Sequence, residues 1–261
     1  MVPPGCCALA VAAALLPQPA NAALVVSSAP TANVGCTAGS CTATAADAVL
    51  NAGDLQTMLA SSGVTLHSGA GARDIIIATP LGWASASTLA LDAALSVLVE
   101  APVTVSGPGG LSVILADGDS VGTLSFGRSG NVTFWDVSSP LTINGVAYTL
   151  VADIKHLQSE VSHHWKRGRL ALANDVRFPK SEKLHAPPLG YFAGKLEGLG
   201  NRVFNLTMAS TAAQDLALML ELDPGGEIEN LNLENVRVDA AQNAAGLVAT
   251  NLGVLRGISV S

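Results

Sequence analysis

The chain has 261 residues, of which 49% are hydrophobic, 13% charged and only 4% aromatic. This composition excludes an intrinsically disordered chain, and the many small and β-branched residues between Gly and Asn favour strands and turns. The formal net charge of −7 argues against a general affinity for nucleic acid. We therefore expect an all-β protein that does not bind nucleic acid.

Residues 1–22 are typical of an export signal. An apolar stretch, CCALAVAAALL, is followed by Pro17 and Pro19, and ANA before Ala23 fits a small-x-small cleavage site. The stretch is too short to cross a bilayer. No Lys or Arg precedes it, so we expect Met1 to be an internal start. The mature chain is expected to be exported and either soluble or surface-bound, without a transmembrane segment.

Residues 23–46 are rich in Ala, Ser and Thr, and this composition predicts a linker. They contain Cys36 and Cys41, in the stretch CTAGSC. Because export permits oxidation of thiols, these two cysteines are a candidate disulfide that closes a small loop. Redox or metal chemistry would need partner residues that the neighbouring sequence does not supply.

Residues 47–151 form the first predicted β block. The helical spacing of Leu55, Met58 and Leu59 predicts a short helix within 47–62. Pairs of apolar residues two apart then recur at intervals of six to eleven residues, from Leu89 to Leu141, with Gly, Pro, Asn or Asp between most of them. Short strands at such intervals fit either a β-sandwich or a solenoid.

Residues 152–190 are predicted to be a helical, basic connector. Nine of the thirteen Lys and Arg residues and four of the five His residues lie between Asp153 and Arg202. Three basic residues, Lys166, Arg167 and Arg169, are a candidate patch for an acidic ligand such as a glycan or a membrane surface. The alternative is a solvated insertion beside the β stack.

No cofactor or metal is expected in this connector. His156, His163 and His164 lack the HExxH or CxxC spacing of common metal sites, which favours solvated histidines.

Residues 191–261 contain a repeated sequence motif. The segments NRVFNLTM (201–208), GEIENLNL (226–233) and GVLRGISV (253–260) align at spacings of 25 and then 27 residues. Such a period is typical of solenoid units, and it favours a right-handed parallel β-helix over a sandwich. In a β-helix equivalent residues of successive coils stack. The predicted ladder, with an amide pair at Asn205 and Asn230, comprises Val203, Asn205, Leu206, Met208, Ile228, Asn230, Leu231, Leu233, Leu255, Ile258 and Val260.

Two pairs of carboxylates are candidates for sugar-cleaving chemistry, because some β-helical proteins degrade polysaccharides. Asp117 and Asp119 flank a glycine in a predicted turn, whereas Glu227 and Glu229 are predicted to point outward on either side of Ile228. No nucleophile–base constellation accompanies either pair. We predict that the chain has no catalytic site.

These segments also carry a family resemblance. GKLEGLGNRVFNLTM (194–208), GGEIENLNLENVRVDA (225–240) and AAGLVATNLGVLRGISVS (244–261) resemble the GLUG-motif repeats of large secreted bacterial adhesins. Upstream, residues 54–93, APVTVSGPGG (101–110) and SSPLTINGVAYTLV (138–151) resemble filamentous-haemagglutinin-like and autotransporter passenger proteins. One copy departs from the G-L-x-G motif, since it reads GLVA at Gly246–Ala249.

The resemblance implies a right-handed β-helical adhesin passenger from a Gram-negative bacterium, exported by outer-membrane machinery and either secreted or displayed at the outer membrane. Its implied partner is a host or abiotic surface. It also implies that the chain is an N-terminal fragment of a longer protein. The alternative is a non-catalytic arm of a larger polysaccharide-degrading or peptidase enzyme.

Overall fold

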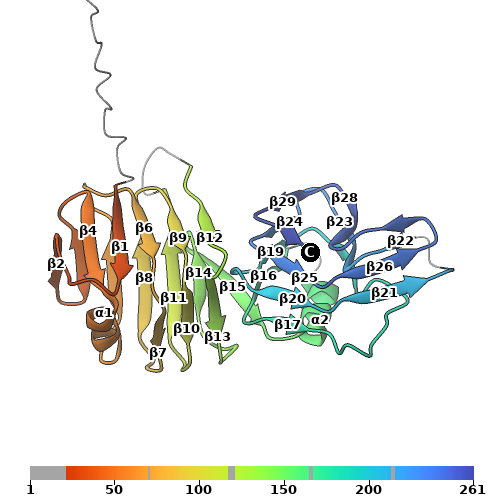
Figure 1. The fold of residues 1–261 in the computed structure, drawn as a ribbon, viewed down its shortest axis with the longest axis horizontal. Helices are drawn as coiled ribbons and strands as arrows, with labels where there is room; N and C mark the ends of the chain where they lie inside the picture. The colour runs from red at the N-terminus through yellow and green to blue at the C-terminus, as the bar shows by residue number, and fades with distance from the viewer. Residues whose placement is uncertain (1–21, 70, 117–120, 165–166, 213–214) are drawn as a thin grey trace, which may run out of the picture.

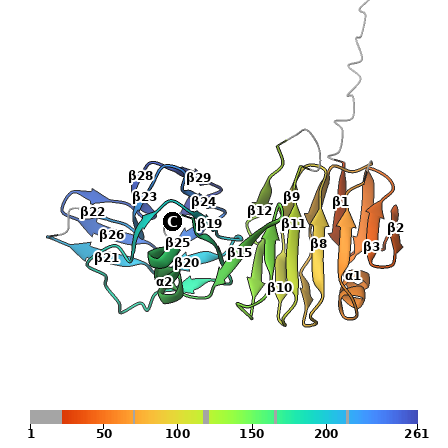
Figure 2. The same ribbon diagram turned by 180° about the vertical axis from the view of Figure 1, so that it is seen from behind.

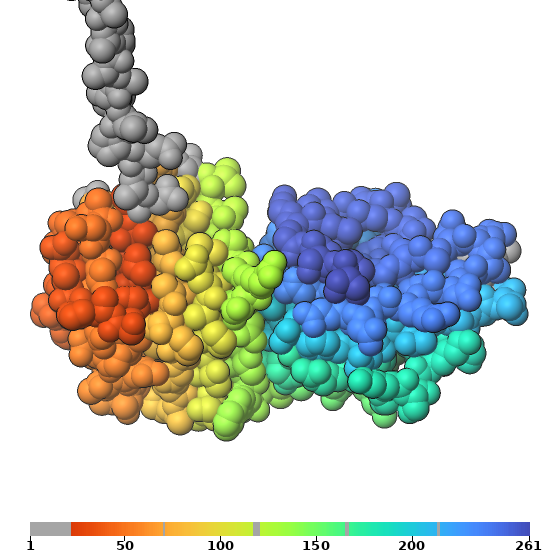
Figure 3. All heavy atoms as spheres, in the orientation of Figure 1, coloured from red at the N-terminus to blue at the C-terminus, as the bar shows by residue number. Residues whose placement is uncertain are grey.

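The computed structural model describes residues 22–69, 71–116, 121–164, 167–212 and 215–261. Strands make up 48% of the described residues and helices 8%, which confirms the expectation of a mostly β protein. Figure 1 shows two stacks of strands side by side, and Figure 2 shows the same arrangement from behind. In the space-filling view of Figure 3 the two stacks are in contact. We call residues 23–143 the N-terminal stack and residues 146–260 the C-terminal stack. The expected export signal lies, apart from Ala22, outside the described residues.

One eleven-stranded sheet runs through both stacks. Its neighbouring strands follow one another in chain order, so each new layer is added beside the previous one. Its strands are β2 (Val34–Thr37), β3 (Ser40–Ala43), β5 (Val64–His67), β8 (Thr88–Asp92), β11 (Gly110–Ile114), β14 (Leu141–Ile143), β15 (Val146–Val151), β16 (Arg169–Leu172), β19 (Lys195–Glu197), β24 (Glu227–Glu229) and β29 (Val254–Arg256).

Two further sheets complete the N-terminal stack. The five-stranded sheet has the order β12 (Leu124–Phe126), β9 (Val97–Val99), β6 (Asp74–Ile77), β1 (Ala23–Ser27) and β4 (Asp47–Asn51). The three-stranded sheet has the order β13 (Asn131–Phe134), β10 (Pro102–Val105) and β7 (Leu81–Trp83).

Four smaller sheets complete the C-terminal stack. They are β17 (Val176–Arg177) with β20 (Arg202–Phe204), β25 (Asn232–Glu234) and β30 (Ser259–Val260); β18 (Leu189–Phe192) with β23 (Met219–Leu222) and β28 (Val248–Asn251); β21 (Thr207–Ser210) with β26 (Arg237–Ala240); and β22 (Asp215–Leu216) with β27 (Asn243–Ala244).

Most of these strands pair in parallel with a strand of the next layer, and like residues lie opposite like residues. Leu66 lies opposite Leu91, for example, and Ile75 opposite Val97, and all four side chains are buried. Among the pairings between these strands, only β2–β3 and β14–β15 are antiparallel. This parallel stacking is consistent with a solenoid-like repeat.

The prediction of a linker over 23–46 is wrong, because this segment contains β1, β2 and β3. Strand β1 lies between β4 and β6 in the five-stranded sheet, and its Leu24 and Val26 are completely buried. The alternation of Leu24 and Val26 is a strand pattern, but the surrounding Ala and Ser residues obscure it in the composition of the segment.

The short N-terminal helix is α1 (Ala52–Leu59), and it starts later than the predicted segment because residues 47–51 form β4. The side chain of Asn51 caps the helix by accepting hydrogen bonds from the backbone N–H groups of Gly53 and Asp54. Leu55 and Leu59 face the core of the N-terminal stack.

A hairpin between β14 and β15 separates the two cores. Asn144 and Gly145 connect the strands with φ angles of 50° and 73°, as a two-residue turn with positive φ requires. On β15, Leu150 packs in the core of the N-terminal stack, while the adjacent Val151 packs in the core of the C-terminal stack. Successive side chains of a strand point to opposite faces, so the two cores lie on opposite faces of one sheet.

The predicted connector, residues 152–190, is only partly an insertion. It contains α2 (Ile154–His164), which buries Leu157 and Val161 against the C-terminal core. Strands β16 and β17 follow in the same segment, and both pair with strands of the next layer. The many charged residues obscured these strands in the sequence, because charges occupy their outward positions while Leu170, Leu172 and Val176 are buried.

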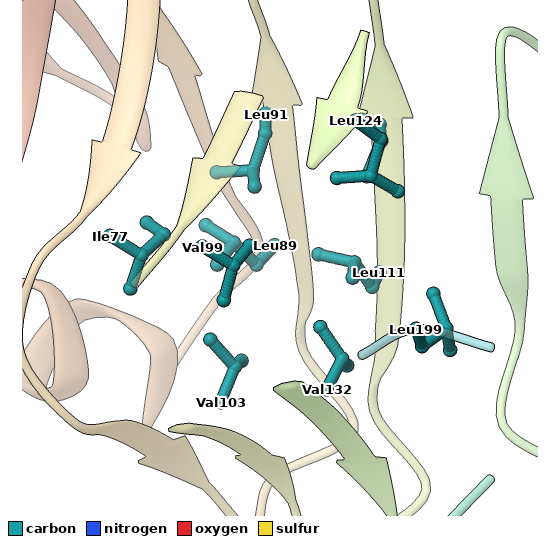
Figure 4. A pocket seen from close by; sticks show the side chains of 10 residues that line it. Ile77, Leu89, Leu91, Val99, Val103, Leu111, Leu124, Val132 and Leu199 are labelled. Carbon is teal, nitrogen blue, oxygen red and sulfur yellow. The ribbon is translucent and has the colours of Figure 1, made fainter. Parts of the chain in front are cut away.

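A loop of the C-terminal stack closes the end of the N-terminal stack. Leu199, between β19 and β20, is fully buried in the N-terminal core. Figure 4 shows Leu199 beside Val132 and Leu111, at one end of a row of aliphatic side chains. The backbone N–H of Val132 donates to the Leu199 carbonyl at 2.9 Å, so this contact joins the stacks through backbone as well as side chain.

Within the described ranges, neither helix is long and apolar enough to cross a membrane.

Candidate functional site

The predicted aliphatic ladder forms, but in a different register. Strand β20 pairs with β25, so Val203 lies opposite Leu233 rather than opposite Ile228. Ile228 lies between Leu196 and Leu255, as the second of the two predicted spacings requires. The predicted spacing of 25 residues, from Val203 to Ile228, is wrong because the sequence contains two similar triplets, Ile228-Glu-Asn and Leu233-Glu-Asn. The strand of Val203 pairs with the second triplet.

The amide pair changes with the register. Asn235 donates from Nδ2 to Oδ1 of Asn205 at 2.8 Å, across 30 residues of sequence. Both residues have positive φ angles, 56° and 60°, a conformation that asparagine tolerates better than most residues. Asn230, the expected partner of Asn205, instead donates from Nδ2 to Glu197 and to the Leu124 carbonyl.

Burial of the predicted ladder residues decreases toward the last layer. Leu206, Met208, Leu231 and Leu233 are buried with Val203 and Ile228. Leu255 and Val260, on β29 and β30, are 37% and 53% exposed, and Ile258 is partly buried.

The disulfide between Cys36 and Cys41 is present in the structure. It bridges the two strands of the β2–β3 hairpin, where the cysteines lie opposite each other. Cys41 is completely buried in the N-terminal core, whereas Cys36 is exposed. The bridge therefore attaches an outer strand to the core.

The candidate acidic-ligand patch is interrupted by acidic residues. Lys166 lies outside the described residues, and Arg167 and Arg169 are exposed. Arg169 lies opposite Lys195 on the next strand, but Lys195 forms an ion pair with Glu227 on the strand after it. Each row of side chains on this face of the C-terminal strands thus mixes basic and acidic residues, and they do not form one basic surface.

The remaining titratable candidates are two glutamates, three histidines and two aspartates. Glu227 and Glu229 flank the buried Ile228 on β24, and Glu229 forms an ion pair with Arg256 at 2.7 Å. His156, His163 and His164 lie on α2. Asp117 and Asp119 are outside the described residues. No group of three or more His, Cys, Asp or Glu residues that could hold a metal ion occurs in the part of the chain that the structure describes.

Glu197 is a buried carboxyl group that the sequence pattern did not single out. It lies at the contact between the stacks, where it accepts hydrogen bonds from Leu199 N at 2.8 Å and Asn230 Nδ2 at 3.1 Å. Burial raises the pKa of Glu197 to about 8, although these hydrogen bonds act in the opposite direction. Its position on β19 is equivalent to that of Glu229 on β24, but only Glu197 is covered by the N-terminal stack.

The C-terminal stack contains an open groove of about 410 Å³ beside α2. We call it the Tyr191 groove. Val161 and Ser162 of α2 form one side, and strands β18 and β23 with the residue that follows β23 contribute the rest. Its lining residues are Val161, Ser162, Gly190, Tyr191, Glu221 and Asp223.

Aromatic and carboxylate groups meet in this groove because their strands are neighbours. Tyr191 on β18 lies opposite Glu221 on β23, and Asp223 directly follows β23. Burial and the nearby Asp223 carboxylate both raise the pKa of Glu221. The sequence pattern does not single out this site, although Tyr191 is one of only two tyrosines in a chain poor in aromatics.

Comparisons with known proteins give one partial similarity. No model of a known protein family matches the chain, and no solved structure matches it. A segment of 71 residues is 38% identical to Halomucin of Haloquadratum walsbyi. The similar segment covers 27% of this chain and 1% of Halomucin, so this chain corresponds to a very small part of that relative.

Proposed function

We propose that the chain is a right-handed parallel β-helix, secreted or displayed at the cell surface, that mediates attachment through an extended surface. The observation that carries the proposal is the eleven-stranded sheet, which spans both stacks and presents one outward face in the N-terminal stack and another, on its opposite side, in the C-terminal stack. Its outward positions recur once per strand, at a spacing of about 4.8 Å. A ligand surface would then meet many similar side chains at fixed intervals.

The N-terminal part of this sheet supports the proposal with a row of hydroxyl groups. Ser40, Thr65, Ser112 and Thr142 occupy the same outward position on β3, β5, β11 and β14, with Ala90 on β8 between them. Thr142 donates to Ser112 at 2.9 Å. Short, constrained hydroxyl side chains lose little conformational entropy when they bind, so weak contacts along such a row can add up.

The C-terminal part presents charged rows, which are suited to a different part of a ligand. Arg169 and Lys195 precede Glu227 along one row, and Glu229 precedes Arg256 along another. Because both signs occur, attachment through this face is expected to depend only modestly on salt.

The resemblance to GLUG-motif and filamentous-haemagglutinin-like passengers supports adhesion as the function, with a host or abiotic surface as the partner. The N-terminal 22 residues support export, and outer-membrane machinery of a Gram-negative bacterium is the proposed route. The partial similarity to Halomucin supports a role as one segment of a larger protein. In this proposal the chain binds and does not catalyse a reaction, and it needs no cofactor.

A second candidate function is the non-catalytic arm of a polysaccharide-degrading enzyme. The Tyr191 groove favours it, since an aromatic ring beside two carboxylates is suited to holding a sugar chain. A peptidase arm has no comparable support. The two candidates differ in whether the chain by itself retains a particle on a surface.

Attachment can be tested with polystyrene beads that carry the purified chain. We expect these beads to be retained under flow on glass or on epithelial cells, and free chain in solution to compete with them. Beads that carry the heat-unfolded chain are the matched control, because composition and charge are identical. Equal retention of both bead types would contradict the proposal.

A further inference from the structure

The Tyr191 groove combines a row of outward residues with a helical wall. Tyr191, Glu221 and Thr250 lie opposite one another on β18, β23 and β28, so their positions are about 4.8 Å apart along the row. Val161 and Ser162 of α2 bound the groove on one side. The site is therefore elongated and open, and it can accept a chain molecule from the side.

The tyrosine ring is available to a ligand. Its side chain belongs to a residue that is 53% exposed, and none of the described residues forms a hydrogen bond with its hydroxyl group. A tyrosine presents a flat apolar face together with one polar atom, and such a face packs against the C–H groups of a sugar ring. An exposed ring in a groove is therefore suited to stacking with a saccharide.

The carboxylates determine which saccharides fit. An ionised carboxylate only accepts hydrogen bonds, and Glu221 and Asp223 can together accept several from hydroxyl or ammonium groups. Hydrogen bonds to a charged acceptor are stronger than neutral ones. The same charges repel sulfate and carboxylate groups, so the groove disfavours acidic glycans.

Gly190 leaves the groove open beside the ring. A Cβ atom built on Gly190 would meet no atom within 4 Å, so packing within the protein does not require glycine here. The absence of a side chain leaves space that a sugar ring can occupy. This position also allows the groove to be filled without disturbing the fold.

We propose that the Tyr191 groove binds a neutral or amino-sugar oligosaccharide, stacked on Tyr191 and held through hydrogen bonds to Glu221 and Asp223. This proposal rests on the proposed attachment function, and it identifies the class of ligand that one part of the surface recognises.

The test is a titration of the purified chain with three hexasaccharides, cellohexaose, chitosan hexamer and heparin hexasaccharide, followed by calorimetry and by saturation-transfer NMR. We expect cellohexaose or chitosan hexamer to bind and heparin hexasaccharide to bind more weakly than either. Gly190→Leu, which fills the groove, and Tyr191→Ala, which removes the ring, are each expected to weaken binding at least tenfold. Glu221→Gln is expected to weaken binding of the chitosan hexamer more than that of cellohexaose.

Trp135→Ala is the matched control, because it removes an exposed aromatic side chain of the N-terminal stack that does not line the groove. We expect it to bind like the unaltered chain. Circular dichroism and thermal unfolding identify any variant that fails to fold. Two results overturn the proposal: failure of both non-anionic hexasaccharides to bind, or tighter binding of heparin hexasaccharide. Full binding by a folded Gly190→Leu variant overturns it as well.

The attachment assay separates this proposal from the proposed function. If beads attach but neither non-anionic hexasaccharide binds, the groove proposal is wrong and the attachment function stands. If these oligosaccharides bind but beads do not attach, the attachment function is wrong and the groove proposal stands.

Discussion

The side-chain amide of Asn201 donates a hydrogen bond to the Val132 carbonyl at 2.8 Å, which joins the loop after β19 to strand β13. The same Nδ2 atom donates to the Leu172 carbonyl at 3.0 Å, and Oδ1 accepts from Asn131 at 3.1 Å. Asn201 is completely buried. One amide therefore satisfies polar groups of both stacks where the two stacks meet.

Asn201→Ala is expected to destabilise the chain by about 2 kcal/mol or more, because it leaves two buried carbonyl groups without this donor. The measurement is chemical unfolding combined with hydrogen exchange, in which exchange should increase first in β13 and β20. The matched control is Asn243→Ala, which removes an exposed side chain that pairs with Asp215. A loss of stability no larger than in the control would contradict the role assigned to Asn201.

Two small substitutions of Asn235, the partner of Asn205, are expected to differ in their effect on stability. Asn235→Gly removes the amide hydrogen bond but tolerates the φ of 56°, so we expect a small loss of stability. Asn235→Ala also places a Cβ in the left-handed region, and it should cost roughly 1 kcal/mol more than glycine. Thermal unfolding measures this difference. If the Asn235→Ala variant proved as stable as the Asn235→Gly variant, the positive φ angle would not explain why asparagine occupies this position.

Glu197 predicts a pH dependence of stability. Its pKa is raised to about 8 in the folded chain, from an ordinary value of 4.5. Between these pH values the folded state retains a proton that the unfolded state has lost. The contribution of Glu197 to the unfolding free energy is therefore fully present below about pH 4.5, and it is lost as the pH rises toward 8.

Glu197→Gln removes this titration, and the unfolding free energy of the variant should depend less on pH from 5 to 8. Glu229→Gln is the matched control, since Glu229 has the equivalent position on the next strand without the cover. A pH profile of Glu197→Gln that matches the unaltered chain would show that another group causes the dependence.

The disulfide predicts unequal effects of its two cysteines. Loss of a bridge that closes so short a loop costs on the order of 2 kcal/mol. Cys41→Ser also buries a hydroxyl group in the core, so it should be about 1 kcal/mol less stable than Cys36→Ser. Urea unfolding with and without dithiothreitol measures the stability contributed by the bridge and the difference in stability between the two variants. Dithiothreitol should lower the stability of the unaltered chain but not that of either variant.

The sequence pattern was sufficient to predict secondary structure wherever apolar residues recurred at regular strand or helix spacing. Apolar pairs such as Val97/Val99 and Val103/Val105 are strands β9 and β10, and Leu55 and Leu59 mark the buried face of α1. The pattern failed at β1, where Ala and Ser surround Leu24 and Val26. It also failed at β16 and β17, where charged residues occupy the outward positions.

The sequence by itself determined that this protein is mostly β and that its C-terminal segments stack in layers, because buried aliphatic residues must alternate with polar ones along every strand. Only the tertiary structure decided which layer follows which. The choice between Ile228 and Leu233 as the partner of Val203 depends on packing, since both satisfy the same local pattern. The burial of Glu197 and the meeting of Tyr191 with Glu221 were likewise decided by packing, because each arises from contacts between segments that are distant in the sequence.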